Sequence, residues 1–462
     1  MPAMQPPEDD AGAVPEGAGD GPRASDGLEA WELPSSVASA WVGFWPHKEA
    51  PDADEVRRSL GTWVGREIDA GTADPDDEDM IWTLIVRIPG VVSPVAFWAQ
   101  KALEADPQQL PDPAMAASPW VIGMQTHLEV GEAADEYFHL MALLTGALPE
   151  LTGVMDVSTA RRWTRRELDE QFQAADAVPN EEHLWTITAV AAREDDEAPM
   201  MLFTTGLTRC GVPELEMLEV PARHAQAAAI LINHVASLLL ESAPPPPCEP
   251  MEVGPESRVA LVPWKECVQF IEAEAPGSGT FRENAEKDGD ASFMGVRAVV
   301  CAAEKRGAFR KVWAWPKDII DRMEDGRAVL YASEHAAAAT ERRAQRTWHA
   351  FATAFASVKR ADDESVASLA ESAFHVQAPV GTVDDQDRRE QGWFVVHRFD
   401  HDVVEATLSE DPVTGDEMHA GDTIRIPRER ITDWRVMLPE EMFGPDRSVA
   451  LLEAIDRLRG IA

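Results

Sequence analysis

Hydrophobic and polar positions alternate along the first third of the chain in a pattern that predicts both strands and helices. Short aromatic or β-branched runs that end at Pro or Gly are typical of buried strands. Apolar residues that recur every three or four positions predict helices with one buried face. The predicted strands lie at 40–46, 80–90, 120–130 and 153–158, and the predicted helices at 52–68 and 136–148. This β-α-β order favours an α+β layer of the ferredoxin-like kind.

The middle of the chain predicts a second group of strands closed by a helix. A helix is expected first at 158–172, because Ser158 or Thr159 can cap its first turn. Three strands are predicted at 183–192, 199–207 and 214–220, followed by a strongly apolar helix at 222–242. The run APPPPCEP then opens residues 243–256, and such Pro-rich segments are typical of linkers between domains.

The C-terminal part predicts long helical and short strand elements. Helices are expected at 332–358 and 448–458 from their apolar spacing. Strict alternation, interrupted by Asp-His and Gly-Asp turns, predicts strands at 393–399, 403–408 and 423–426. These three strands are expected to form a small antiparallel sheet.

Length and composition organise these elements into a multidomain α+β protein. Single cores seldom grow beyond about 250–300 residues, so a chain of 462 residues is expected to hold several domains. Residues 1–30 contain five Gly, five Pro and seven acidic residues, which predicts a disordered acidic tail. The predicted N-terminal domain spans 31–242, with two subdomains divided near residue 175 as an alternative. The C-terminal domain is expected at 257–462, after the linker.

The charge of the chain excludes several kinds of partner. It has 41 Lys and Arg against 82 Asp and Glu, a formal net charge of −41. Such a field repels phosphate backbones and anionic lipids, so neither nucleic acid nor a membrane is an expected partner. The four Cys lack metal-ligand spacing, and reduced, mostly buried thiols are expected. No cofactor is predicted, the start of the sequence lacks the features of a signal peptide, and a cytoplasmic location is expected. The oligomeric state stays open.

The C-terminal region resembles the YegJ-like domain of unknown function, a bacterial domain, over residues 335–438. The similarity is carried by Ala344, Thr347, Trp348 and Phe351 in the predicted helix, by Trp393–Val396, and by the run GDTIRIPRERITDW that begins at Gly421. The resemblance implies a small α+β domain and no established reaction.

Residues 202–218, LFTTGLTRCGVPELEML, resemble a segment of another uncharacterised bacterial family with a His-Thr-His-Gly-Leu core. Thr204, Gly206, Leu207 and Arg209 match that core and its following Arg. Both family histidines are replaced here, by Phe203 and Thr205. A role that needs imidazoles at these positions is therefore not expected in this chain.

The same segment is the first candidate site. Its residues Thr204, Thr205, Gly206, Arg209, Glu214 and Glu216 suit a ligand-gripping loop, with backbone N–H groups near the glycines and a cation for an anionic group. The alternative is a Gly-shaped connection between strands whose glutamates face solvent.

Three further candidates are weaker. His397, His401 and His419, with neighbouring Asp side chains, could bind a metal ion if a hairpin brought them together, although a solvated polar turn explains them better. Arg162 and Arg166 form cationic rows on the predicted helix at 158–172, for an acidic partner segment or for pairing with nearby carboxylates. Asp433 and Trp434 close a strand and suit either a core anchor or a binding hot spot.

These features favour a non-enzymatic interaction protein whose acidic surface engages a basic protein partner. The most concrete version is an immunity-type role, in which the protein masks a basic, nuclease-like toxin. One alternative is a hydrolase or metal-dependent enzyme with a site between the domains, lined by Arg209, Glu214, His397 and Asp433. Another is that the acidity is only an adaptation to salt.

Overall fold

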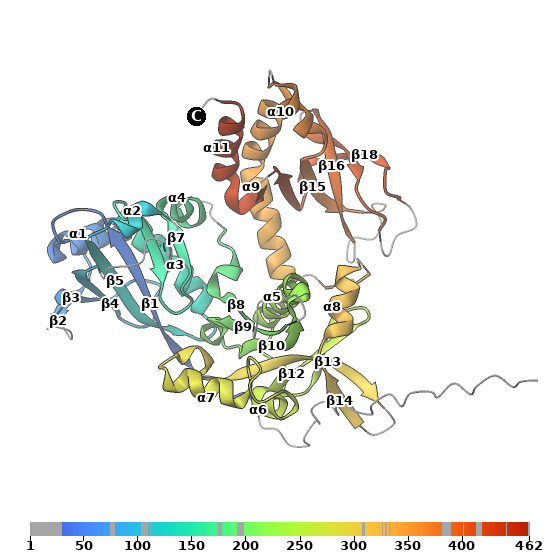
Figure 1. The fold of residues 1–462 in the computed structure, drawn as a ribbon. Helices are drawn as coiled ribbons and strands as arrows, with labels where there is room; N and C mark the ends of the chain where they lie inside the picture. Colours follow the sequence, from blue (N-terminus) through green and yellow to red (C-terminus); the bar gives the residue numbers. More distant parts are fainter. Residues whose placement is uncertain are drawn as a thin grey trace, which may run out of the picture.

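The computed structural model describes most of the chain in three sheets and their covering helices (Figure 1). The predicted tail at 1–30 lies outside the described residues except for Ala30. The described residues are 30–73, 79–102, 110, 112–173, 178–191, 198–306, 310–325, 327–328, 330–331, 333–361, 363–380, 390–400, 402–412, 418–439 and 441–460.

The first sheet is antiparallel throughout, with the strand order β2-β3-β4-β5-β1-β6-β7. Its strands are β1 (Ser36–Trp45), β2 (Ala70–Ala73), β3 (Met80–Val86), β4 (Val95–Lys101), β5 (Trp120–Glu129), β6 (Gly153–Asp156) and β7 (Arg162–Thr164). Its helices are α1 (Ala53–Val64), α2 (Pro113–Ala116), α3 (Ala133–Ala147) and α4 (Arg165–Leu168). Within it, β1-α1-β4-β5-α3-β6 has the spatial order β4-β5-β1-β6, which is the ferredoxin-like arrangement that the sequence predicts.

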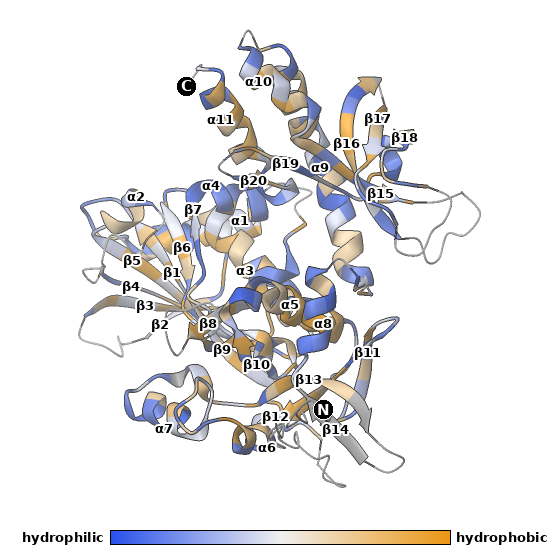
Figure 2. Cartoon of the chain, turned by 45° about the vertical axis from the view of Figure 1, so that its right-hand side comes forward, coloured by the Kyte–Doolittle hydropathy of each residue, from blue (hydrophilic) through white to orange (hydrophobic). Residues whose placement is uncertain are grey.

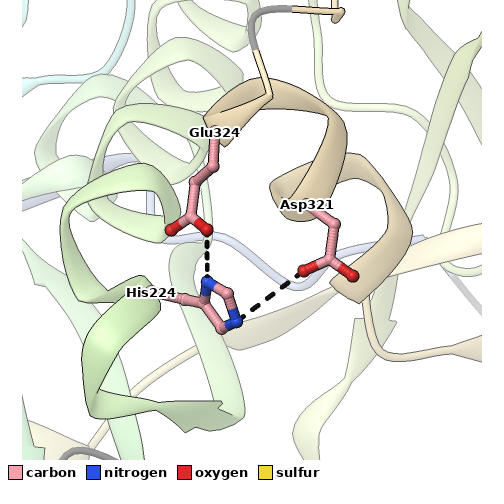
Figure 3. A group of neighbouring side chains, drawn as sticks. All are labelled: His224, Asp321 and Glu324. Atoms are coloured by element: carbon pink, nitrogen blue, oxygen red, sulfur yellow. Dashed lines mark hydrogen bonds and ion pairs between the residues drawn. The ribbon is translucent and has the colours of Figure 1, made fainter.

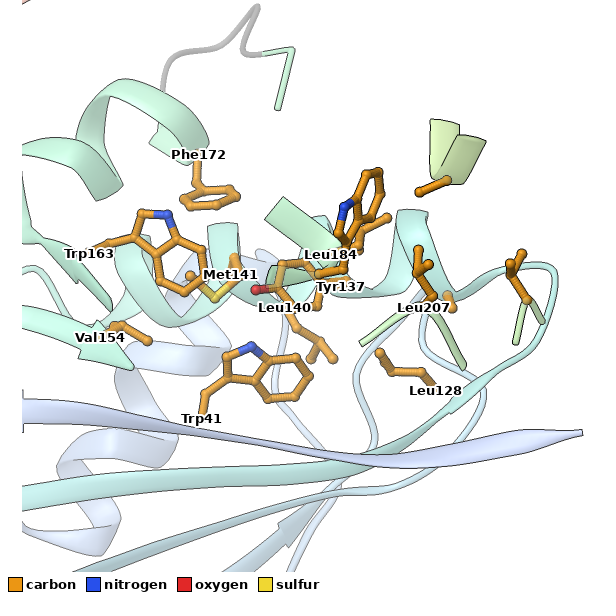
Figure 4. Packing of buried hydrophobic residues seen from close by; sticks show 14 of the residues in the cluster. Trp41, Leu128, Tyr137, Leu140, Met141, Val154, Trp163, Phe172, Leu184 and Leu207 are labelled. Atoms are coloured by element: carbon orange, nitrogen blue, oxygen red, sulfur yellow. The ribbon is translucent and has the colours of Figure 1, made fainter. Parts of the chain in front are cut away.

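Helices α1 and α3 pack against one face of this sheet and bury its core (Figure 4). Trp41 of β1 lies beneath Tyr137 of α3, with ring centroids 5.4 Å apart. Helix α1 ends at Gly65, whose φ of 75° is a left-handed conformation that glycine adopts without strain. Val56 and Leu60 of α1 are buried, so the apolar stripe predicted at 52–68 is the surface of the helix that faces this core.

The second sheet joins parts of the chain on both sides of the predicted linker. Its strands are β8 (Thr186–Ala191), β9 (Pro199–Thr205), β10 (Glu214–Pro221), β11 (Pro250–Gly254), β12 (Ser257–Pro263), β13 (Arg297–Arg306) and β14 (Arg310–Ala314). They lie in the order β11-β12-β13-β10-β9-β8, with β14 beside β13, and β10 pairs with β13 in parallel. Residues 243–256 therefore do not separate two sheets, because strands from both sides of the predicted linker pair in one sheet.

Helices cover this sheet as well. They are α5 (Ala225–Glu241), α6 (Trp264–Cys267), α7 (Gly279–Lys287) and α8 (Lys317–Glu324). Helix α5 corresponds to the helix predicted at 222–242 and is coloured as hydrophobic over most of its length (Figure 2). All four Cys are free; Cys248, Cys267 and Cys301 are buried in one apolar cluster, and burial raises the pKa of the Cys301 thiol.

The third sheet, with the order β18-β17-β16-β15-β19-β20, belongs to a unit that begins with α9, and we use the name C-terminal domain for this unit, which is smaller than the 257–462 expected. Its elements are α9 (Glu334–Lys359), α10 (Glu364–Ser368), β15 (Phe374–Pro379), β16 (Gln391–Asp400), β17 (Val403–Leu408), β18 (Thr423–Pro427), β19 (Asp433–Met437), β20 (Met442–Phe443) and α11 (Ser448–Leu458). The predicted long helix, small antiparallel sheet and closing helix are confirmed. This domain has a hydrophobic core of its own, and the α+β class of the whole chain is confirmed.

The helix predicted at 158–172 is wrong in its first half. Residues 162–164 form strand β7 beside β6, and helix α4 begins only at Arg165. The reason is a capping box: Thr164 and Glu167 bond to each other's backbone N–H, which starts the helix there. A five-residue π-helix, η2 (Asp169–Gln173), follows directly.

None of the helices in the described part of the chain combines the length and the apolar character that crossing a bilayer requires.

Candidate functional site

Glu214 holds the loop between β9 and β10 closed from within. One carboxylate oxygen, Oε1, accepts hydrogen bonds from Gly206 N at 2.8 Å and from both the backbone N and the hydroxyl of Thr208 at 3.0 Å. The other oxygen, Oε2, accepts from the Thr204 hydroxyl at 2.8 Å. Gly206 has a φ of 118°, and a Cβ there would lie 2.3 Å from the Leu184 carbonyl oxygen. The backbone N–H groups expected to grip a ligand are thus bonded to a side chain of the same loop.

Glu216 lies between two buried arginines. Arg282 of α7 donates to both oxygens of Glu216, at 2.9 and 2.5 Å, and Arg297 of β13 donates its Nε–H to Oε1. The exposed fractions of the three side chains are 0%, 6% and 1%. Arg282 also donates to the Gly277 carbonyl, and Arg297 to the carbonyls of Ser292 and Thr204. Glu216 therefore ties α7 and β13 to β10.

Aromatic rings enclose this Arg-Glu-Arg cluster. The Arg282 guanidinium lies 4.5 Å from the Trp264 ring centroid, and the Arg297 guanidinium lies 5.4 Å from that of Phe203. Phe293 contacts both guanidinium groups, at 5.5 and 5.7 Å. Phe203 stands where the resembling family has its first histidine, and here it supplies a ring face for a buried cation.

Arg209 forms a second buried ion pair beside the first sheet. Its Nη1 donates to Asp156 Oδ2 at 3.0 Å, and the Tyr137 hydroxyl donates to the same oxygen at 3.1 Å. Burial opposes the charge of Arg209, but Asp156 and Tyr137 outweigh it and raise its pKa. Nη2 of Arg209 is buried without a hydrogen-bond partner, although an anionic ligand from solvent could not reach a side chain that is 1% exposed.

The structure of this loop agrees better with a connection between strands than with a ligand-binding loop, with one difference. It is a Gly-shaped connection, but Glu214 and Glu216 point into the protein instead of toward solvent. Thr204 is buried with them, and Thr205 is half-buried at the end of β9. The polar groups of the loop bind one another, so the loop holds two sheets and a helix in place.

Arg162 and Arg166 do not form cationic rows on one helix. Arg162 lies in β7 and Arg166 in α4, where Arg166 pairs with Glu453 of α11 in the C-terminal domain. Arg165 pairs with Asp169, one of the carboxylates expected as a partner. The arginines thus serve contacts within the chain, including one between domains.

That contact belongs to a polar interface between the C-terminal domain and the rest of the protein. The Glu170 carboxylate of η2 accepts from Ser448 Oγ at 3.1 Å and from Val449 N at 2.6 Å, at the first turn of α11. Glu241 of α5 binds the first turn of α9 in the same way, through Ser333 Oγ and His335 N. Two carboxylates from outside the C-terminal domain, Glu170 and Glu241, therefore cap two of its helices. Burial raises the pKa of Glu170.

Trp434 is a core anchor. It is fully buried, its Nε1 donates to the Thr347 hydroxyl at 3.1 Å, and its ring centroid lies 5.2 Å from that of Phe351. Asp433 beside it is half-buried at the start of β19 and accepts a hydrogen bond from Trp434 N. Burial raises the pKa of the Asp433 carboxyl to about 6, against the opposing effects of that hydrogen bond and of Arg343.

The two described histidines weighed as metal ligands have different partners. His397 bonds to the Thr407 hydroxyl at 2.7 Å, and His419 faces Asp411 at 3.7 Å. His401 lies outside the described residues. Neither described histidine belongs to a group of three metal-ligating side chains within the described part of the chain.

One other group, which the sequence did not indicate, has suitable side chains: His224, Asp321 and Glu324 (Figure 3). His224 Nδ1 lies 2.7 Å from Glu324, and Nε2 lies 3.7 Å from Asp321. However, Arg223 donates its Nε–H to Nε2 at 3.0 Å. The nitrogen that faces Asp321 is therefore bonded to a cation, and the group works as a polar link between α8 and the start of α5.

Sequence reasoning missed the partners that explain the site. Asp156, Arg282 and Arg297 lie 53, 66 and 81 residues from the groups they bind. A weak signal exists for Arg297, which stands at the start of the strongly apolar strand β13, where an unpaired charge would be costly.

The fold and these contacts define a multidomain α+β protein whose charged interior groups are paired with one another. Comparison with protein families adds two matches. Residues 187–294 match the model described as protein of unknown function (DUF4026), C-terminal, and residues 334–448 match the model described as uncharacterized protein conserved in bacteria (DUF2314). No curated protein and no solved structure matches the chain.

The two matches include segments that the sequence singled out, although the first also runs across the predicted linker at 243–256. The first contains the loop of Glu214 and Glu216, and the second spans α9 to the start of α11, close to the predicted 335–438. Together they show a bacterial multidomain protein, and both descriptions leave its activity open. The YegJ-like label stays a prediction.

Proposed function

We propose that this protein is a non-enzymatic interaction module whose acidic surface binds a basic protein partner. The supporting observation is where the charge lies. Among the described residues, the buried acidic side chains are Glu136, Asp156, Glu214 and Glu216, and the buried basic ones are Arg209, Arg282, Arg297 and Arg343. Four of each sign cancel, so the buried side chains of the described residues contribute nothing to the net charge of −41.

Part of this acidity is concentrated around α7. Between residues 272 and 290 the exposed carboxylates belong to Glu272, Glu274, Glu283, Glu286, Asp288 and Asp290, with Lys287 as the exposed cation. The basic residue that could neutralise them from within, Arg282, is turned inward to Glu216. A surface of this kind attracts cationic proteins and accelerates their association. An immunity-type role, in which a basic toxin is masked, is the most concrete form of this proposal.

Affinity capture from the host lysate at low and high salt tests the proposal. The immobilised protein is expected to retain basic proteins at about 50 mM salt and to release them at about 0.5 M, because screening shortens the electrostatic range. The neutralised variant E283Q/E286Q/D288N is expected to retain less than the matched variant E49Q/E67Q/D69N, which removes the same charge elsewhere. If no basic protein is retained at low salt, the proposal is wrong.

The enzyme alternative has less support. Arg209 and Glu214 lie beside the second sheet and are occupied by Asp156 and by the loop backbone, whereas His397 and Asp433 lie on the third sheet. The contacts described for these four residues do not connect the two pairs. The salt-adaptation alternative predicts instead that the fold loses stability below molar salt, which an unfolding series in KCl measures.

A further inference from the structure

Among the described residues, no long helix covers one face of the first sheet. Helices α1 and α3 bury the face that carries Trp41 and Phe97. On the opposite face, Met115 of α2 packs with Phe44 and Val121, and Val42 and Met155 are partly buried against this cluster. Ile81 and Ile85 of β3 remain 47% and 42% exposed. We call this uncovered surface, formed by the outward positions of β1, β3, β4, β5 and β6, the outer face.

The outer face is nearly free of carboxylates. The pairing registers place Val42, Gly123, Trp98 and Thr83 in one row across four strands. The other outward positions hold Ser, Ala, Val, Ile, Met, Gln, Phe, Gly and His, and their one acidic residue is Glu129, the last residue of β5. In a chain with 82 acidic residues, such a surface is a marked exception.

Trp98 gives the outer face a flat apolar centre. A Cβ at Gly123 would lie 2.0 Å from the Trp98 indole, so the ring lies directly across this glycine. Trp98 is half-buried, so part of this side chain remains accessible. Contiguous exposed apolar surface on a protein marks an interaction site, and aromatic residues commonly anchor such sites.

We infer that the outer face binds the outer face of a second copy of this chain, forming a two-fold symmetric dimer. Charge selects this occupant. Two chains of −41 can make close contact only where neither presents carboxylates, and the outer face satisfies this from both sides of a symmetric contact. A basic partner has no electrostatic reason to choose a surface without carboxylates.

The dimensions suit a weak contact. The five strands of the outer face, about 4.8 Å apart, give a width of about 20 Å, and about six residues along the central strands give about 20 Å. Side-chain relief enlarges this flat area, so the contact lies at the lower end of specific interfaces, below the ~800 Å² per partner of a standard one. Sheets that pack face to face lie about 10 Å apart, which leaves room for interleaved side chains such as Trp98 and Ile85.

Sedimentation equilibrium of the purified full chain at several salt concentrations tests the dimer. Salt screens the repulsion between two acidic copies, so the mass is expected to rise from the monomer value of 50.7 kDa toward twice that value between about 0.05 and 0.5 M NaCl. Binding of a basic partner is expected to weaken over the same range. The dimer and the proposed function can therefore fail separately.

Two variants place a carboxylate on the outer face without touching the core. Gln125→Glu replaces an exposed side chain with one of the same size, and Ile85→Asp adds charge beside Trp98. Each is expected to weaken dimerisation at least tenfold. Ile230→Asp on α5, which is 53% exposed elsewhere, is the matched control and is expected to dimerise normally. Circular dichroism confirms that each variant is folded.

Three results would overturn the inference. The first is a monomeric wild type at about 100 µM protein and 0.5 M salt. The second is dimerisation that Gln125→Glu leaves unchanged. The third is an equal loss in Ile230→Asp, which would place the contact elsewhere.

Discussion

The second and third sheets are closed in opposite ways. Around the second sheet, Glu216 binds two arginines from α7 and β13, in a setting from which water is excluded. The third sheet is closed on α9 by aromatic rings: Phe351 packs against Trp434 at 5.2 Å and against Phe374 at 5.6 Å. The second sheet is held by a buried ion cluster, and the third sheet is held by the burial of apolar area.

The difference teaches what each device contributes. Removing one partner of a buried ion pair leaves an unpaired charge, which costs far more than the intact pair contributes. The loss of one contact in an aromatic cluster costs less stability, because the stabilisation is spread over many atoms. The ion cluster thus enforces one arrangement of α7, β10 and β13, and the aromatic cluster mainly supplies stability.

The largest effect is expected from Glu216→Gln. The two arginines would remain buried without their carboxylate, and the free energy of unfolding should fall by about 3–5 kcal/mol. Glu252→Gln, which breaks an exposed pair with Arg258, is the control and should change it by about 0–1 kcal/mol. Urea unfolding measures both. A loss below about 1 kcal/mol for Glu216→Gln would show that the cluster is not stabilised as an ion pair.

Trp434→Phe is expected to cost less, about 1–3 kcal/mol. The variant keeps a ring beside Phe351 but loses part of its volume and the hydrogen bond to Thr347. Trp120→Phe, whose indole N–H bonds to Lys48 at an exposed site, should cost clearly less in the same urea experiment. Equal losses at both sites would remove the distinction between anchor and surface tryptophans.

The pH dependence of stability sharpens the comparison further. Burial raises the pKa of Asp433 to about 6 from its usual 3.8, so between about pH 4 and 6 the native state holds a proton that the unfolded chain has released. Stability should therefore fall as the pH rises through this window. Asp433→Asn should remove this slope and raise the free energy of unfolding at pH 7 by about 1–3 kcal/mol.

Thermal unfolding of wild type and Asp433→Asn between pH 4 and 7 measures this difference. Asp456→Asn, an exposed carboxylate on α11, is the control and should keep the slope of the wild type. A wild-type slope that survives in Asp433→Asn would assign it to other buried carboxylates, of which Glu170 and Glu181 also have raised pKa values.

Arg166→Ala should have the smallest effect. Its pair with Glu453 joins α4, beside the first sheet, to α11 of the C-terminal domain, but the side chains are 45% and 47% exposed. Solvent screening limits such a pair to about 0–1 kcal/mol in a two-state unfolding fit. A larger loss, with the C-terminal domain becoming sensitive to proteolysis, would mean that the interface holds the domains together more firmly than its polar character indicates.

Local patterns predicted most of the elements but not their partners. Periodicity located α1, α3, α5, α9 and three strands of the third sheet, β16, β17 and β18, because each has one apolar face. The predicted helix at 158–172 failed because the capping box at Thr164 outweighs the helical spacing before it. In a single sequence, a Thr followed three residues later by a Glu is recognised as a capping box only if a helix is already expected to begin at that Thr.

The candidate site shows the same limit more sharply. Glu214 and Glu216 were recognisable as unusual residues, yet their burial could not be inferred, because alternating Glu residues in a strand normally face solvent. Their neutralisation depends on Arg282 and Arg297, which long segments of chain bring into place. Net charge was predictable, whereas its division into a balanced interior and an acidic exterior required the structure.

The parallel pairing of β10 with β13 has a consequence for synthesis in the cell. Strand β10 ends at Pro221, and its neighbour β13 is complete only at Arg306. At about 5–20 residues per second, a ribosome needs several seconds to make the intervening chain. Throughout that delay the newly made β10 presents an open edge, at which Glu216 still lacks both arginines. An unpaired charge on an open strand edge discourages premature pairing with other chains, so the same carboxylate that later fastens the sheet can act first as a gatekeeper during translation.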